Sequence, residues 1–188
     1  MRDPDVLVIG GGATGVGVAR DLALRGFDPL VVDRGGFCSG ASGRSHGLLH
    51  SGARYAESDP DGAAECLAEA RTLKRVAGAC LAESGGLFVS LADDDDAYFE
   101  EKRAACRSVG IPVETLTPGE ARSIVPDLSA EVERAMRVPD GVVYPSRLIA
   151  ANALDARAHG AELGPHTDVE AITVRDGAVA AVRLGGAD

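Results

Sequence analysis

Three consecutive glycines, residues 10–12, stand near the start of the chain, within the stretch VLVIGGGATGVGVARDLALRG of residues 6–26. Glycine is a poor former of helices and strands, so this run predicts a turn between two regular elements. Residues 6–9 form a continuous aliphatic run, typical of a strand buried on both faces of a parallel sheet. Residues 14–25 carry apolar side chains at helical spacing, and Gly26 is a good helix C-terminal residue. The stretch therefore predicts a strand, a tight turn and a helix.

The glycines of this turn follow the G-x-G-x-x-G spacing at Gly10, Gly12 and Gly15. In that pattern the first glycine permits the turn, the second lets the main chain approach a diphosphate, and the third lets the helix pack closely on the strand. Residues 29–33 (PLVVD) predict a second buried strand ending at Asp33, whose carboxylate can accept a hydrogen bond from a ribose hydroxyl. These features predict a βαβ unit that binds a dinucleotide at the helix N-terminus; a purely structural glycine turn is the alternative.

A loop rich in glycine and serine follows, over residues 35–52. Such a loop can present many main-chain N–H groups to phosphate and to a flavin ring, so it favours FAD over NAD. An NAD-dependent dehydrogenase is the least favoured interpretation, because nothing after Asp33 resembles a separate catalytic domain behind a nicotinamide site.

The rest of the chain alternates helical and strand patterns. Residues 117–120 (TPGE) place a capping threonine, a first-turn proline and a glutamate in order, so a helix is predicted to begin there. Residues 169–174 and 178–184 predict a hairpin that turns at residues 175–177 (RDG). The other predicted elements are helices over 61–81, 97–109 and 146–159 and a strand over 87–91.

Charge and cysteine content restrict the classes of function. The formal net charge of −10 argues against a general affinity for nucleic acid or anionic lipid, although a local basic pocket could still bind an anionic substrate. The four cysteines form no C-x-x-C pair and lie at no metal-ligand spacing from a histidine, so we expect reduced thiols in an intracellular protein and no metal site. We see no signal peptide and no apolar run approaching ~18 residues, so we expect no cleaved leader and no membrane-spanning helix.

Three stretches resemble the FAD-dependent glycerol-3-phosphate dehydrogenases, most closely the catalytic A subunits of the anaerobic, respiratory enzymes: GGGATGVGVARDLALRG, GASGRSHGLLHSGARYA and VPDGVVYPSRLIAANALDARAHGAEL. The last two are more specific than the glycine pattern, and the family belongs to a wider group similar to D-amino-acid oxidase. The resemblance implies non-covalent FAD and oxidation of sn-glycerol 3-phosphate to dihydroxyacetone phosphate. It also implies that electrons pass through partner subunits to a membrane quinone, in a cytoplasmic enzyme held at the inner face of the cell membrane by those partners.

The resemblance also implies site residues. Arg54 and Tyr55 fall where the family binds the substrate phosphate, and a planar guanidinium can hold phosphate through two hydrogen bonds. From the residues alone, a surface Arg54 paired with Glu57 or Asp59 remains the alternative. We predict no catalytic base within this chain. The residues that match the family's FAD contacts are Gly10, Gly12, Ala13, Thr14, Gly15, Asp33, Arg34, Gly40, Ala41, Ser42, Gly43, His46, Leu48, Leu49 and Val169.

The implied fold is α/β: a Rossmann-like FAD-binding domain with a parallel sheet, plus part of an α+β substrate domain. Residues 1–85 are expected to form the first part of the FAD-binding domain, residues 86–140 the start of the substrate domain, and residues 141–188 the return to the FAD-binding domain. The family's proteins are much longer, so we expect a truncated chain that alone binds FAD weakly and turns over little or no substrate. Two other functions stay open: a related flavin oxidoreductase acting on an amino acid or a 2-hydroxy acid, and a non-catalytic dinucleotide-binding module.

Overall fold

The predicted βαβ unit is present at the start of the chain. In the computed structural model, which describes residues 3–186, β1 (Val6–Ile9) is followed by α1 (Ala13–Leu24) and β2 (Pro29–Asp33). The two strands pair in parallel, with Val6 opposite Pro29. β2 is largely buried, as predicted, but β1 is only partly buried and Ile9 is exposed. The difference arises because β1 lies at the edge of this sheet as far as the described residues show.

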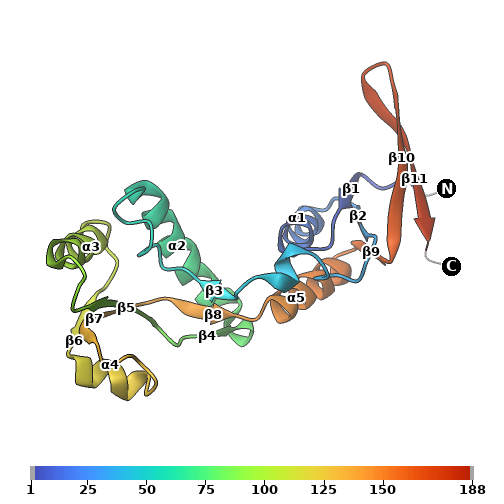
Figure 1. Cartoon of the computed structure of the whole chain (residues 1–188). Helices are drawn as coiled ribbons and strands as arrows, with labels where there is room; N and C mark the ends of the chain where they lie inside the picture. Colours follow the sequence, from blue (N-terminus) through green and yellow to red (C-terminus); the bar gives the residue numbers. More distant parts are fainter. Residues whose placement is uncertain (1–2, 187–188) are drawn as a thin grey trace. The chain divides into compact units, whose positions relative to one another are not determined.

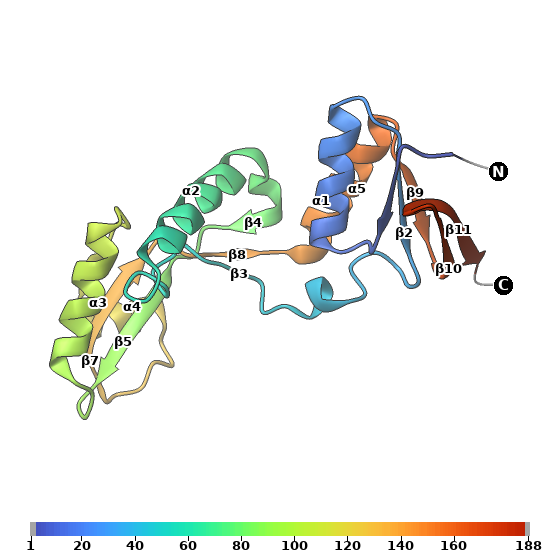
Figure 2. The ribbon, with the colours of Figure 1, turned by 90° about the horizontal axis from the view of Figure 1, so that it is seen from above.

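A third parallel strand, β9 (Glu162–Pro165), pairs with β2 and gives the sheet the order β1-β2-β9. Its sequence, ELGP, carries no strand pattern, and no strand is predicted there. The preceding helix α5 (Pro145–Ala158) confirms the helix predicted over 146–159, and it packs against α1 (Figure 2). Small side chains allow the close approach of the two helices, because Ala23 of α1 and Ala156 of α5 are buried in one cluster.

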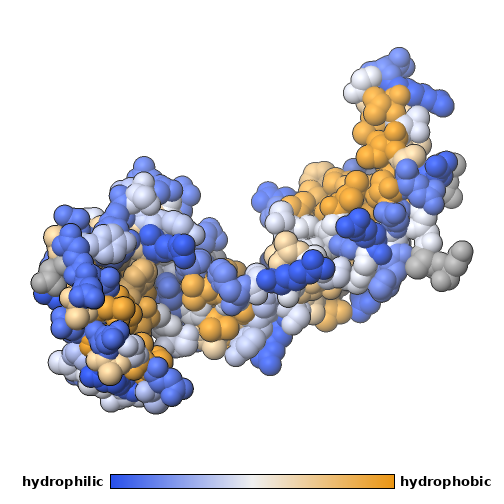
Figure 3. All heavy atoms as spheres, viewed as in Figure 1, coloured by the Kyte–Doolittle hydropathy of each residue, from blue (hydrophilic) through white to orange (hydrophobic). Residues whose placement is uncertain are grey.

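The predicted hairpin is present and longer than its pattern indicates. β10 (Thr167–Arg175) and β11 (Ala178–Gly186) pair antiparallel around Asp176 and Gly177, both of which have positive φ, as a tight hairpin turn requires. Apolar side chains of the hairpin are exposed in the described structure, including Val174 at 60% and Val179 at 65%, and they form the apolar band seen on it in Figure 3.

A small antiparallel sheet, with the order β3-β8-β4, follows the glycine- and serine-rich loop. It joins β3 (Leu48–Leu49), β8 (Gly141–Val143) and β4 (Leu81–Ala82). The helix predicted over 61–81 is wrong beyond Val76: α2 covers Pro60–Val76, and a short 3-10 helix, η2 (Gly78–Cys80), leads into β4. Val76 is 69% exposed, so a longer helix would gain no burial there, whereas residues 81–82 gain main-chain pairing with β8.

A second antiparallel sheet has the order β5-β7-β6 (Figure 1). β5 (Gly86–Leu91) and α3 (Asp96–Ser108) confirm the predicted strand and helix, and α4 (Pro118–Ile124) begins at the predicted cap. The central strand β7 (Val132–Val138) pairs with both β5 and β6 (Glu114–Leu116), neither β6 nor β7 having been indicated by pattern. Buried alanine and methionine residues of β7 contribute to the core under α4.

The chain contacts divide the protein into two units. The first contains residues up to His46 together with those from Tyr144 onward, and the second runs from Gly47 to Val143. Parallel sheet, helices and hairpin in one unit, and mixed helices and antiparallel sheets in the other, confirm the predicted fold class. Which residues belong functionally with cofactor or substrate is a separate question, so the predicted domain limits at residues 85 and 140 remain predictions. Among residues 3–186, no helix has the length and apolar character needed to cross a membrane.

Candidate functional site

The turn between β1 and α1 needs glycine at its first and last motif positions. Gly10 has φ of +114°, a conformation that other residues rarely adopt. A side chain at Gly15 would overlap the main-chain carbonyl oxygen of Gly10, so only glycine lets the first turn of α1 lie this close to the end of β1. The two structural roles predicted for these glycines are therefore met.

Asp33, at the end of β2, is held beside this turn by main-chain groups. Its Oδ2 accepts a hydrogen bond from the N–H of Gly11 at 2.7 Å, and its Oδ1 accepts one from the N–H of Gly35 at 2.8 Å. A carboxylate has about four acceptor positions, so each oxygen keeps capacity for a ribose hydroxyl. The contact with Gly11 was not predicted; the signal for it was the parallel pairing of β1 with β2, which brings the ends of both strands to one edge.

The predicted cofactor loop also reaches the glycine turn. Ser42, in the short 3-10 helix η1 (Ala41–Arg44), accepts a hydrogen bond at its Oγ from the N–H of Ala13, with a length of 3.0 Å. The N–H of Cys38 donates to the carbonyl of Gly11 at 3.1 Å. The structure therefore brings together two segments that the sequence predicted separately, residues 10–15 and residues 40–43.

The helix N-terminus at this point remains able to bind an anion. Ser42 occupies the N–H of Ala13, but for the N–H groups of Gly12, Thr14 and Gly15 we find no acceptor within residues 3–186. Free N–H groups at the first turn carry the positive end of the helix dipole and suit a phosphate group. The residues present therefore fit a diphosphate.

The other predicted cofactor residues are distributed over both units. Arg34 and His46 are exposed in the first unit, and Val169 is half-buried in β10 opposite Leu184. Leu48 and Leu49 form β3 in the second unit, where they pair with Val142 and Gly141. Their roles toward FAD remain predictions.

The predicted substrate residues Arg54 and Tyr55 lie in a turn of the second unit that precedes α2. Both side chains are exposed, and the ring of Tyr55 lies 5.8 Å from that of His50. The turn begins at Ser51, whose N–H donates to the buried carboxylate of Asp140 at 2.6 Å. Tyr55 and Asp59 continue the turn through main-chain hydrogen bonds to Gly52 and Tyr55, respectively.

The structure does not show the alternative interpretation of Arg54 as one member of a surface ion pair. Glu57 pairs with Lys102, whose Nζ lies 2.5 Å from the glutamate Oε2. Asp59 caps α2 by accepting the N–H of Gly62 at 3.0 Å. Both carboxylates are thus engaged elsewhere, and within the described residues the guanidinium of Arg54 has no hydrogen-bond or ion-pair partner.

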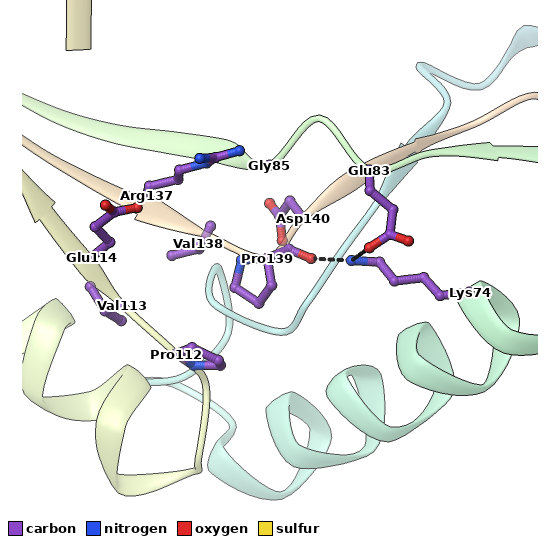
Figure 4. Close-up of a pocket in the computed structure, with 10 residues that line it drawn as sticks. All are labelled: Lys74, Glu83, Gly85, Pro112, Val113, Glu114, Arg137, Val138, Pro139 and Asp140. Atoms are coloured by element: carbon purple, nitrogen blue, oxygen red, sulfur yellow. Dashed lines mark hydrogen bonds and ion pairs between the residues drawn. The ribbon is translucent and has the colours of Figure 1, made fainter. Parts of the chain in front are cut away.

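The largest hollow of the second unit lies away from these residues. A pocket of about 360 Å³ is lined by both acidic and basic side chains, and its Lys74 donates to the carbonyl of Pro139 at 3.0 Å and pairs with Glu83 at 3.5 Å (Figure 4). It contains none of the predicted cofactor or substrate residues. Because its cations already have protein partners, it offers an incoming anion little uncompensated charge.

The cysteines and acidic residues provide no further reactive site. Burial raises the pKa of the Cys106 thiol above its ordinary value, so the thiol stays protonated at neutral pH and is a poor nucleophile. Over the described part of the chain, no group of three or more histidine, cysteine or acidic side chains could hold a metal ion.

Comparison with known proteins adds a family to this geometry. Residues 5–188 match the model of the family described as "DAO: FAD dependent oxidoreductase". The chain is 51% identical over 97% of its length to the A1 subunit of the anaerobic glycerol-3-phosphate dehydrogenase of Haloferax volcanii, covering 31% of that protein. It is 47% identical over 97% of its length to the A subunit of the anaerobic glycerol-3-phosphate dehydrogenase of Escherichia coli, covering 34% of it. The chain thus spans about a third of the length of these relatives.

A similar fold occurs in solved structures. The crystal structure of L-proline dehydrogenase from P. horikoshii superposes with a TM-score of 0.83 and 26% identity, over 97% of this chain and 49% of that one. The match covers the elements of both units.

Proposed function

The chain belongs to the DAO family of FAD dependent oxidoreductases, and on that premise we propose that it forms part of an enzyme that oxidises sn-glycerol 3-phosphate to dihydroxyacetone phosphate. The identity of 51% over 97% of the chain to one component of a glycerol-3-phosphate dehydrogenase carries the proposal. An amino acid substrate has weaker support, since identity to the L-proline dehydrogenase is 26%. FAD is the cofactor of the family, as the sequence predicted.

The first unit supplies the proposed FAD site. The free N–H groups of Gly12, Thr14 and Gly15 would bind the diphosphate, and Asp33 would accept hydrogen bonds from the ribose. Ser42 fixes the neighbouring loop against α1, so residues 40–43 would lie beside the same diphosphate. When bound, FAD supplies the acceptor for the hydrogen and electrons removed from the substrate alcohol.

Arg54 and Tyr55 would orient the substrate through its phosphate. Arg54 is suited to this because its guanidinium has no counter-charge in the described structure and can donate two parallel hydrogen bonds. Holding the phosphate fixes the distance of the reacting carbon from the cofactor, which is the protein's main contribution to such a reaction. The base that takes the hydroxyl proton is assigned to no residue of this chain.

Electron transfer to partner subunits and onward to a membrane quinone belongs to the same proposal. Support comes from the names of the relatives, which designate them the A or A1 component of an anaerobic enzyme with several subunits. A cytoplasmic location at the inner face of the cell membrane, reached through those partners, follows from this proposal.

The proposal can be tested in a chimera, in which this chain replaces the matching segment of the Escherichia coli relative. We expect dye reduction that depends on glycerol 3-phosphate and a KM raised roughly 10- to 100-fold by Arg54→Ala, because a charge-assisted phosphate contact is lost. Arg71→Ala, which removes another exposed arginine of the second unit, is the matched control and should leave KM unchanged.

Three outcomes would contradict the proposal. Turnover of an amino acid or a 2-hydroxy acid, but not of glycerol 3-phosphate, would favour the related flavin oxidoreductase. A folded chimera that binds FAD without turning over any of these substrates would favour the non-catalytic module. An unchanged KM in the Arg54→Ala variant would remove Arg54 from the substrate site.

A further inference from the structure

Helix α3 supports the turn that carries Arg54 and Tyr55. Two residues one helical turn apart on α3 contact its main chain: Lys102 donates to the carbonyl of Arg54 at 3.4 Å, and the Cys106 thiol donates to the carbonyl of Ala53 at 3.8 Å. Ala53 itself is fully buried against Cys106. The backbone of the turn is therefore anchored on α3, while the Arg54 side chain is exposed.

The same lysine determines the charge available near Arg54. Glu57 follows Arg54 by three residues in one turn, which makes it the nearest carboxylate in sequence, yet it pairs with Lys102. The Lys102 side chain is only 6% exposed, and its ammonium lies 5.6 Å from the Tyr98 ring centre and 5.9 Å from that of Phe88. A buried ammonium requires a counter-charge, so Glu57 is committed to Lys102 and withheld from Arg54.

The use of lysine in this sequence is consistent with a specific requirement at this position. Of 19 basic residues, only Lys74 and Lys102 are lysines. Each is largely buried, donates to a main-chain carbonyl and pairs with a glutamate. A compact ammonium with three donors fits such sites, whereas the wider planar guanidinium does not replace it in the same space.

We propose that Lys102 is a positioning residue for the phosphate-binding arginine: it anchors the main chain of Arg54 and sequesters Glu57, leaving the Arg54 guanidinium free for an anion. This inference rests on the proposed function, in which Arg54 receives the substrate phosphate. It predicts that loss of Lys102 harms anion binding chiefly through the released carboxylate, and that removing this carboxylate as well restores binding.

The test uses the active chimera. We expect Lys102→Met to raise the KM for glycerol 3-phosphate about three- to fivefold with little change in kcat, the effect of one competing exposed ion pair. The double variant Lys102→Met/Glu57→Gln should return KM to within about twofold of the parent, and Lys74→Met, at the other buried lysine, should not change KM beyond that margin. A KM that stays raised in the double variant, or that is unchanged in Lys102→Met, would overturn the inference.

A second readout, in the 188-residue chain alone, does not depend on turnover. Phenylglyoxal modifies free guanidinium groups, and mass spectrometry follows the rate at Arg54. We expect slower modification in Lys102→Met and recovery in the double variant; equal rates in all three proteins would overturn the inference. Lys102→Gln, which keeps hydrogen-bond donors, replaces Lys102→Met should the latter not fold. If the parent chimera fails to oxidise glycerol 3-phosphate, the proposed function fails, whereas the labelling rates still decide the role of Lys102.

Discussion

Gly15 and Gly17 lie two residues apart in α1, yet their surroundings differ. A side chain at Gly15 would overlap the carbonyl oxygen of Gly10, and Val8 of β1 lies next to the same point. A side chain at Gly17 would have no heavy atom within 4 Å. The first glycine is required by the contact between helix and turn, whereas the second is tolerated at a cost in helix propensity.

Replacement of these two glycines by alanine should have opposite effects. Gly15→Ala should lower the free energy of unfolding by about 2–3 kcal/mol, because the main chain has to move to admit the methyl group, and it should abolish FAD binding. Gly17→Ala should raise it by about 0.5–1 kcal/mol. Urea unfolding followed by circular dichroism measures both values. Equal destabilisation by the two changes would show that the close approach at Gly15 has no special weight.

The cap of α4 illustrates how a short helix is stabilised at its start. The Thr117 hydroxyl accepts the N–H of Glu120 at 3.3 Å, and the Glu120 carboxylate accepts the N–H of Thr117 at 2.7 Å. These hydrogen bonds from Thr117 lower the pKa of Glu120 below its ordinary value of 4.5. Because the folded state favours the ionised carboxylate, its contribution to stability is present above that value and is lost as the pH falls through the lowered pKa.

Loss of the cap should therefore depend on pH in a defined direction. Thr117→Ala should reduce the free energy of unfolding by about 1 kcal/mol at neutral pH. Glu120→Gln should lower the urea midpoint at neutral pH, and the difference from the parent should shrink as the pH is lowered below 4.5. Urea titrations at several pH values measure this difference. A difference that grows on acidification would contradict the sign of the shift.

At the scale of the whole molecule, the two units are built differently from the chain. The second unit is one continuous segment, and it contains a complete buried cluster that joins its first turn, α2, α3 and β7. The first unit is discontinuous: residues before 47 supply β1, α1 and β2, whereas residues after 143 supply α5 and β9, which pack on α1 and pair with β2.

We therefore expect residues 47–143, produced alone, to fold cooperatively. Their buried clusters draw on no residue outside this segment, so the hydrophobic burial that stabilises the unit is retained. The matched control is residues 1–46, which should not fold because α5 and β9 are missing. Urea unfolding followed by circular dichroism distinguishes the two. A non-cooperative transition in 47–143, or a folded 1–46, would contradict this account of the units.

Local signals in the sequence were sufficient for part of the fold and part of the candidate site. The turn at residues 10–15, the cap at Thr117 and the hairpin turn at residues 175–177 each depend on side chains only a few positions apart. Such patterns act through backbone conformation and nearby hydrogen bonds, so they could be recognised before the structure was known. The family and its cofactor were recognised from longer stretches of the same kind.

Only the tertiary structure decided which partners these segments would have. Strand β9 has a weak sequence pattern and forms because β2 offers it an open parallel edge. Asp33 receives the N–H of Gly11, and Glu57 is taken by Lys102 instead of Arg54. These contacts join residues far apart in the chain, and their stability comes from burial and from pairing of groups that folding first brings together. The sequence alone determined the local turns, caps and cofactor pattern, whereas three-dimensional packing decided which charges remain free to bind a ligand.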